Sequence, residues 1–229
     1  MSYKKFFSSE EEYTTFYSKS ANVHARLLSN FSTCAIAIDF SCLCDEHMDI
    51  VTYPSGEHAF HGGKFKIISA QLGICAARHT ELLEYSRLFE GNALKDSHFK
   101  SSADAKRAGG KSGVRLTESE LRNWDAQSML LQEQICREKL KDPATLQFLL
   151  STEDRYLVHF ERATGWPRYG AVVLTVDNSP YNDGLRWMKG DNLLGEMWVK
   201  LREELRTEHS SIQFMTSNGA CLTCNARNS

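Results

Sequence analysis

The sequence contains no hydrophobic run long enough to cross a membrane. Its opening segment, MSYKKFFSSEEEY, is polar and has no apolar stretch of signal-peptide length. Elsewhere no apolar run approaches the roughly 18 residues of a membrane span. Internal repeats and low-complexity blocks are also missing. We therefore expect a cytoplasmic or nuclear protein that has no membrane partner.

The sequence also lacks a large excess of positive or negative charge. The chain of 229 residues has 27 Lys and Arg against 29 Asp and Glu, a formal net charge of -2. This balance argues against binding to long nucleic-acid tracts, which requires a broad basic surface. Local basic positions still allow contact with a nucleic-acid end or a single modified nucleotide. These positions are Lys106, Arg107, Lys111 and Arg115.

The cysteines do not form a disulfide framework. There are seven of them, an odd number, and no secretory signal accompanies them. Cys42 and Cys44 lie in a polar loop, and Cys221 and Cys224 lie in a polar tail. Reduced thiols are the favoured interpretation, and zinc held by one of these pairs is the less favoured alternative. We predict no metal site and no organic cofactor.

The periodicities that are present are mainly helical. Thr117 and Glu120 form a capping box, and Asp142 with Pro143 is a typical helix start. Apolar residues also recur with helical spacing over 193–205 and over an amphipathic segment at 78–89. The strand candidates are short, at 35–38 and 50–53 as a hairpin, 156–160 and 171–176. We predict a mainly α, multihelical single domain over residues 1–206, with a few short β strands, and a polar, flexible tail over 207–229.

The segment YPSGEHAFHGGKF, residues 53–65, carries the chemically most informative pattern. Ser55 is placed as the N-cap of a helix, so Glu57 falls in the first turn, where the helix dipole favours a carboxylate. Lys64 follows seven residues, or about two turns, later. His61 lies between them on the same stripe. The sequence therefore predicts an acid, an imidazole and an amine on one helix face.

That pattern alone has an ordinary explanation. An acid and a lysine on one helix face usually form a solvated surface pair. Gly62 and Gly63, between them, are expected to leave room for another group to approach the backbone. Other motifs are needed before the pair can be assigned a function.

These motifs resemble the signature of the NADAR family, also called YbiA-like proteins. In that family a Ser-Asn-Phe element precedes a hairpin and a helix with Glu-His and, seven residues after the Glu, Lys-Phe. The matching positions here are Ser29, Asn30, Phe31, Glu57, His58, Lys64 and Phe65. Stretches 105–111, 121–140, 146–152 and 190–205 continue the match in the family's order. The resemblance spans about residues 28 to 205 and implies the YbiA-like fold.

The resemblance implies cleavage of an N-glycosidic bond, between ribose C1 and a nitrogen. We expect a monomer that releases ADP-ribose from ADP-ribosylated guanosine, or from guanine in nucleic acid. The alternative substrates are phosphorylated intermediates of riboflavin biosynthesis. An alternative of another class is a non-catalytic module that binds ADP-ribose or NAD. The presence of both Glu57 and Lys64 favours the enzyme.

Three residues are predicted to be catalytic. Glu57 stabilises positive charge at C1 or acts as general base for water. Lys64 is either a neutral amine that attacks C1 and forms a Schiff base, or a cation that holds a phosphate or hydroxyl. Many family members carry an acid shortly before Trp-Gly-x-Gly, and Asp183 is the candidate for that role here.

The candidates for substrate binding are polar or aromatic. Trp124 either stacks on a base or belongs to the core, and Asn192 either holds ribose hydroxyls or is simply an N-cap. Trp166 and Tyr169 are the aromatic alternatives to Asp183. The full predicted set is Asn30, Phe31, His58, His61, Lys106, Trp124, Trp166, Tyr169 and Asn192.

Overall fold

The computed structural model describes residues 5–41, 43, 50–72, 76–162, 165–175 and 185–219. As predicted, these residues are mainly helical with a few short strands. The helices are α1 (Gly56–Ala70), α2 (Ala77–Arg87), α3 (Ser102–Gly109), α4 (Glu118–Lys139), α5 (Pro143–Ser151) and α6 (Leu193–Gly219). The strands are β1 (Phe6–Phe7), β2 (Tyr13–Phe16), β3 (Thr33–Asp39), β4 (Ile50–Ser55), β5 (Tyr156–His159), β6 (Val172–Thr175) and β7 (Arg186–Lys189). Within these ranges, no helix combines the length and apolar character that a membrane crossing requires.

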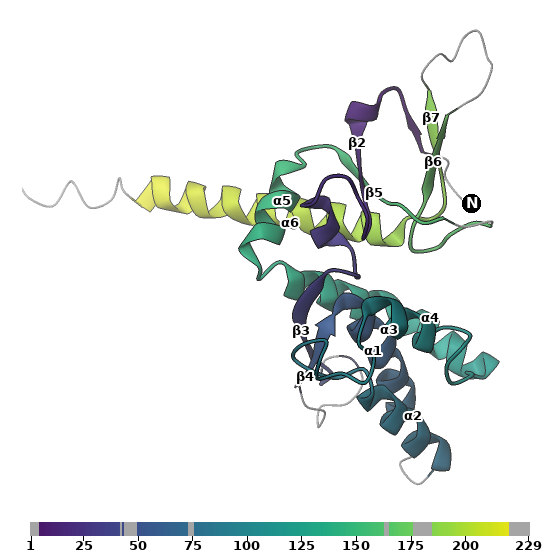
Figure 1. The fold of residues 1–229 in the computed structure, drawn as a ribbon. Helices are drawn as coiled ribbons and strands as arrows, with labels where there is room; N and C mark the ends of the chain where they lie inside the picture. The colour runs from purple at the N-terminus through teal and green to yellow at the C-terminus, as the bar shows by residue number, and fades with distance from the viewer. Residues whose placement is uncertain are drawn as a thin grey trace, which may run out of the picture.

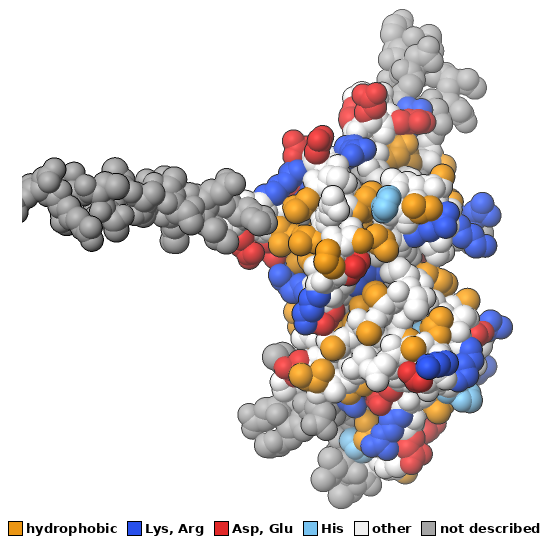
Figure 2. All heavy atoms as spheres, turned by 60° about the vertical axis from the view of Figure 1, so that its left-hand side comes forward, with side chains coloured by type: hydrophobic (Ala, Val, Ile, Leu, Met, Phe, Trp, Pro, Cys, Tyr) orange, Lys and Arg blue, Asp and Glu red, His pale blue; other side chains and the backbone are white. Residues whose placement is uncertain are grey.

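The elements form two halves (Figure 1). One half contains β3, β4 and helices α1 to α4, and its core packs the hairpin against α1, α2 and α4. The other half contains the remaining strands with α5 and α6, and its core includes Trp198 and Leu157. Helix α4 contacts both α1 and α6, so it joins the halves. Lys, Arg, Asp and Glu are interspersed over the face shown in Figure 2, which has no continuous basic surface.

The strands pair in three small sheets. β3 and β4 form the predicted antiparallel hairpin, and the candidates at 156–160 and 171–176 become β5 and β6. β2 pairs in parallel with β5, and β1, β7 and β6 form an antiparallel sheet in that order. Strands β1, β2 and β7 were not predicted. β1 has only two residues, and the partners of β1 and β2 are distant in the chain. β7 pairs with the nearby β6, but its sequence RWMK lacks the apolar run that indicated β5 and β6.

Helix α1 follows β4 without a loop. The Ser55 hydroxyl accepts from the backbone N–H of His58, which confirms the predicted N-cap. A side chain on Gly62 would lie 2.7 Å from Cβ of Phe89, and one on Gly63 would lie 2.7 Å from a methyl of Leu131. The close approach expected at these glycines is therefore observed, and the approaching groups are the side chains of Phe89 and Leu131. They allow the protein's own core to pack against α1.

The caps of α4 and α5 are confirmed. Thr117 and Glu120 form the reciprocal capping box of α4, and the Asp142 side chain caps α5 with Pro143 at its first turn. Arg78 of α2 donates to both carboxylate oxygens of Glu120, at 2.9 and 3.0 Å. The capping box therefore also fixes the start of α4 against α2.

Helix α6 is longer than the sequence predicted. It continues to Gly219, whereas a polar segment without helical periodicity was expected from Thr207, so the expectation of no helix is wrong for 207–219. The segment is polar but contains no proline, and it has no glycine before Gly219, so nothing in it breaks a helix. Arg206 also pairs with Glu203 one turn earlier.

Candidate functional site

The side chains of Glu57 and His61 meet on α1, as their spacing predicts. His61 Nε2 lies 3.2 Å from Glu57 Oε2. Glu57 is in the first turn, and its N–H donates to the carbonyl of Asn30 at 2.8 Å. Glu57 is only 8% exposed. The carboxylate therefore has a fixed position in a largely dry environment.

Lys64 is also buried, with 8% exposed. Its Nζ donates to the carbonyl of Gly109 at the end of α3 and lies 4.6 Å from the ring centre of Phe65. Burial alone lowers the pKa of Lys64 to about 8, and no described carboxylate offsets that effect. At pH 7 about one molecule in ten therefore carries a neutral Lys64 amine. That population makes nucleophilic chemistry accessible.

An aromatic cluster covers the same face of α1. The Phe60 ring makes edge contacts with Trp124 at 5.0 Å, with Tyr169 at 5.2 Å and with His61 at 5.5 Å between centroids. Trp124 is only 6% exposed and belongs to the core. Tyr169 is half-buried and comes from the other half of the molecule. The structure thus brings two predicted aromatic residues to the Glu57 stripe, although Trp124 presents little surface for stacking.

The loop before β3 brings two further predicted residues to Glu57. Asn30 exchanges both amide hydrogen bonds with Gln132 of α4, at 2.9 and 3.2 Å, so its side chain is already satisfied. Phe31 is half-buried, and the exposed Lys106 lies with Nζ 5.4 Å from its ring centre. Of this set, Phe31 and Lys106 have surface left for a ligand.

His58 is fully buried and has no free ring nitrogen. Its Nδ1 lies 2.7 Å from the Ser55 hydroxyl, and its Nε2 lies 2.8 Å from the carbonyl of Phe99. The Ser55 hydroxyl also accepts from Ser102 at 3.0 Å. His58 therefore links α1 to α3 and to the segment before it, and it does not reach a substrate.

Asn192 is also fully buried. Its amide donates to the Leu157 carbonyl at 2.8 Å and accepts from the N–H of His159 at 2.9 Å. Its backbone carbonyl accepts from Glu196 N, which places it at the N-cap position of α6. Its φ of 54° is in the left-handed region that asparagine tolerates. The amide holds β5 to the start of α6, so it is not available for ribose hydroxyls.

The remaining predictions lie apart from the cluster or outside the described residues. Trp166 is 41% exposed, and its Nε1 donates to Asp191 at 2.6 Å. Asp183 lies outside the described residues, and so do the two cysteine pairs, Cys42 with Cys44 and Cys221 with Cys224. The described cysteines, Cys34 and Cys136, are free thiols. The described ranges contain no group of three or more His, Cys, Asp or Glu placed to hold a metal ion.

Sequence reasoning missed three residues that shape the site. Phe60 lies three residues after Glu57, and that spacing could have indicated a shared face. Gly109 and Gln132 contact the site through tertiary structure, for which the sequence carries no local signal.

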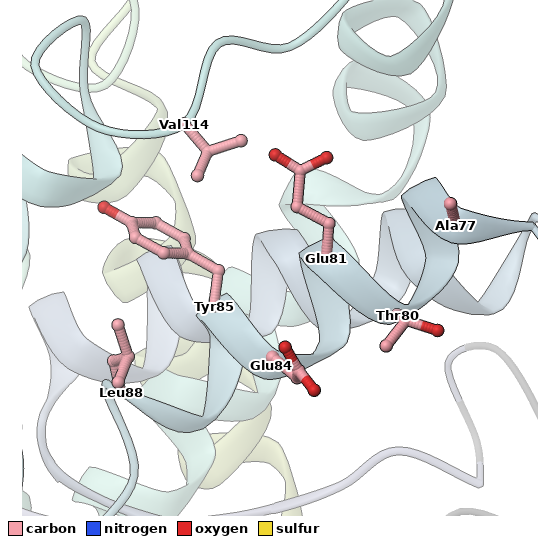
Figure 3. Close-up of a pocket in the computed structure, with 7 residues that line it drawn as sticks. All are labelled: Ala77, Thr80, Glu81, Glu84, Tyr85, Leu88 and Val114. Carbon is pink, nitrogen blue, oxygen red and sulfur yellow. The ribbon is translucent and has the colours of Figure 1, made fainter.

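A groove of about 750 Å3 lies elsewhere, between α2 and the loop before α4 (Figure 3). In this view the side chains of Glu81 and Tyr85 extend from α2 toward Val114. None of the lining residues belongs to the predicted site. They are Ala77, Thr80, Glu81, Glu84, Tyr85, Leu88 and Val114.

Comparison of the chain with known protein families, with curated proteins and with solved structures found no match. The interpretation of the site therefore depends on its own residues and on the sequence motifs.

Proposed function

We propose that the protein is an N-glycosidase of the NADAR type, with a YbiA-like fold, that hydrolyses the ribose C1–nitrogen bond of ADP-ribosylated guanosine or of guanine in nucleic acid. The observation that carries this proposal is the buried pair of Glu57 and Lys64. The two lie two turns apart on α1, and the lysine has no described acid partner. Binding alone would not need a buried amine without an acid partner on the same helix as a buried carboxylate.

In the simplest route Glu57 acts on C1 and on water. As the C1–N bond breaks, its electron pair leaves with the guanine nitrogen, and C1 becomes positively charged. The Glu57 carboxylate stabilises that charge. Water then adds to C1 and passes a proton to Glu57, leaving a hydroxyl on C1 of the released ADP-ribose. The proton goes on to the guanine nitrogen, which returns Glu57 to the carboxylate. In this route Lys64 stays protonated and holds a phosphate or hydroxyl.

In the second route Lys64 is the nucleophile. The neutral amine bonds to C1 as the guanine nitrogen leaves with the electron pair of the broken bond. A proton then moves from the new C1–N nitrogen to the ring oxygen, and the ring opens to a protonated Schiff base. Water adds to this C=N bond and gives a carbinolamine, which breaks down to the neutral amine and an aldehyde that closes again to ribose. The proton released in this step goes to the guanine nitrogen. The buried position of Lys64 supports this route.

The test follows free ADP-ribose by mass spectrometry after incubation with ADP-ribosylated guanosine. We expect wild type to release ADP-ribose, and Glu57→Gln and Lys64→Ala to release none. Lys66→Ala, a change on the same helix outside the cluster, is the matched control and is expected to retain activity. An adduct trapped by borohydride in wild type but not in Lys64→Ala would identify the lysine as nucleophile.

Three other results would contradict this assignment. Cleavage of riboflavin intermediates alone would move the substrate to the alternative class. Binding of ADP-ribose without cleavage would indicate a binding module. Full activity of Lys64→Ala would remove the lysine from the mechanism.

The pH profile separates the two roles of Lys64. Because burial lowers the pKa of Lys64 to about 8, the neutral amine becomes the major form above that pH. If the amine is the nucleophile, kcat/KM is expected to rise about five-fold from pH 7 to 8, and about two-fold more before it levels off. If the cation holds the substrate, activity falls over the same range instead. Lys64→Arg keeps the charge, so it should retain activity only in the second case.

A further inference from the structure

The imidazole of His61 is clamped between two neighbours. On one side Phe60 makes an edge contact at 5.5 Å between ring centres. On the other side the backbone of Gly109 lies so close that a Cβ there would sit 2.1 Å from His61 Cγ and 2.2 Å from Nδ1. The ring therefore has little freedom to turn, and the absence of a side chain at Gly109 is what allows the contact.

The two ring nitrogens of His61 have different surroundings. Nε2 faces the Glu57 carboxylate at 3.2 Å. Nδ1 is buried, has no hydrogen-bond partner among the described residues, and lies against the Gly109 backbone. A proton on Nδ1 would be a buried donor without an acceptor, which is costly, whereas a proton on Nε2 is donated to a carboxylate. The environment therefore favours the tautomer protonated at Nε2 only.

The charges around His61 also bear on its protonation. Glu57 favours the imidazolium, whereas Lys64 of α1 and Lys106 of α3 oppose it. His58, one turn earlier, is a further titratable neighbour. Burial is the largest effect and lowers the pKa of His61, so the ring is neutral near pH 7.

We infer that His61 is the positioning residue of the site, a neutral imidazole whose one N–H holds the Glu57 carboxylate while its bare Nδ1 is sealed by the backbone of Gly109. This reassigns His61, which the sequence suggested as a substrate ligand. The tautomer follows from the geometry alone, and its catalytic consequence rests on the proposed function. His61 transfers no proton in this role. It fixes the direction of Glu57.

The tautomer can be measured without any substrate. Nitrogen-15 NMR of the histidine side chains, with His61→Gln used to assign the signals, reports which ring nitrogen carries the proton. We expect one protonated and one bare nitrogen in His61 at pH 7, with Nε2 protonated. Protonation at Nδ1, or at both nitrogens at pH 7, would overturn the inference. This result stands or falls independently of glycosidase activity.

Two substitutions then test the positioning role in the proposed reaction. Gln places an amide donor near the position of Nε2 but cannot transfer a proton, so His61→Gln should keep most of kcat. His61→Leu removes the donor, and kcat should fall about 10- to 100-fold with little change in KM. Equal loss in both variants would mean that His61 transfers protons and would overturn the assignment. His98→Gln, an exposed histidine on a loop, is the control and should be unchanged. If wild type is inactive, the proposed function fails while the NMR result remains decisive for the tautomer.

Discussion

Replacing Lys64 by methionine is expected to make the protein more stable and to abolish its proposed activity. Lys64 is 8% exposed, and burial lowers its pKa from 10.5 to about 8. Between these two pH values the unfolded chain holds more protons than the folded one, so wild-type stability rises with pH through this window. At pH 7 the buried charge lowers the stability of the wild type by roughly 3 kcal/mol, and Lys64→Met removes that cost. The substitution also removes the hydrogen bond to Gly109, which lowers its stability by about 1 kcal/mol. We expect a net stabilisation on the order of 1 to 2 kcal/mol.

The measurement is urea unfolding of wild type and Lys64→Met at pH 7 and at pH 9.5. The stabilisation should shrink at the higher pH, where the folded wild type already holds a neutral amine. Lys66→Met is the matched control, because Lys66 lies on the same helix, 3.8 Å from Glu90. Its substitution should change stability little at either pH. If Lys64→Met instead destabilised the protein at pH 7, Lys64 would be a structural clamp on the end of α3.

If Lys64→Met is more stable than the wild type but inactive, the buried amine at this position serves activity and not stability. Natural proteins often carry residues that lower stability where activity needs them, and an uncompensated charge in a core is a clear case. Lys139, in contrast, is a buried lysine with a structural role. Lys139 is also buried, but it donates to the Ser29 carbonyl at 2.6 Å and to the Ser32 hydroxyl at 2.5 Å. It therefore holds the loop before β3.

Features that depend on neighbouring residues were predictable from the sequence. The N-cap at Ser55, the capping box at Thr117 and the start of α5 at Asp142 all depend on side chains within three residues of one another. The stripe of Glu57 and His61 likewise follows from the helical repeat. For such features, local chemistry and the observed structure agree.

Features that depend on distant partners were not predictable in this way. His58 and Asn192 look like available polar side chains in the sequence, but Nε2 of His58 and the amide of Asn192 are bound by segments far away in the chain. Gly62 and Gly63 were expected to let another group approach the backbone, but only the fold shows that these groups are core side chains. The sequence states which groups are present. Only the fold determines which of them are already satisfied.

Gly109→Ala is expected to disrupt the site from outside α1. An alanine at the last residue of a helix normally adds up to about 1 kcal/mol of stability. Here its Cβ would lie 2.1 Å from Cγ of His61, so the ring or the end of α3 must move. We expect a loss of about 2 to 3 kcal/mol, typical of overpacking in a core. Gly110→Ala is the matched control, because its Cβ would approach only backbone carbonyls at 3.3 and 3.5 Å.

A double-mutant cycle tests whether the clash with the His61 ring causes the destabilisation by Gly109→Ala. His61→Ala opens space for the methyl group, so Gly109→Ala should cost little in that background. The coupling free energy, measured by urea unfolding of all four proteins, is expected to be about 2 kcal/mol. An equal cost in both backgrounds would place the effect in the backbone of α3. Because the Gly109 carbonyl also accepts from Lys64, a large coupling would mean that one backbone position sets the geometry of both His61 and the proposed nucleophile.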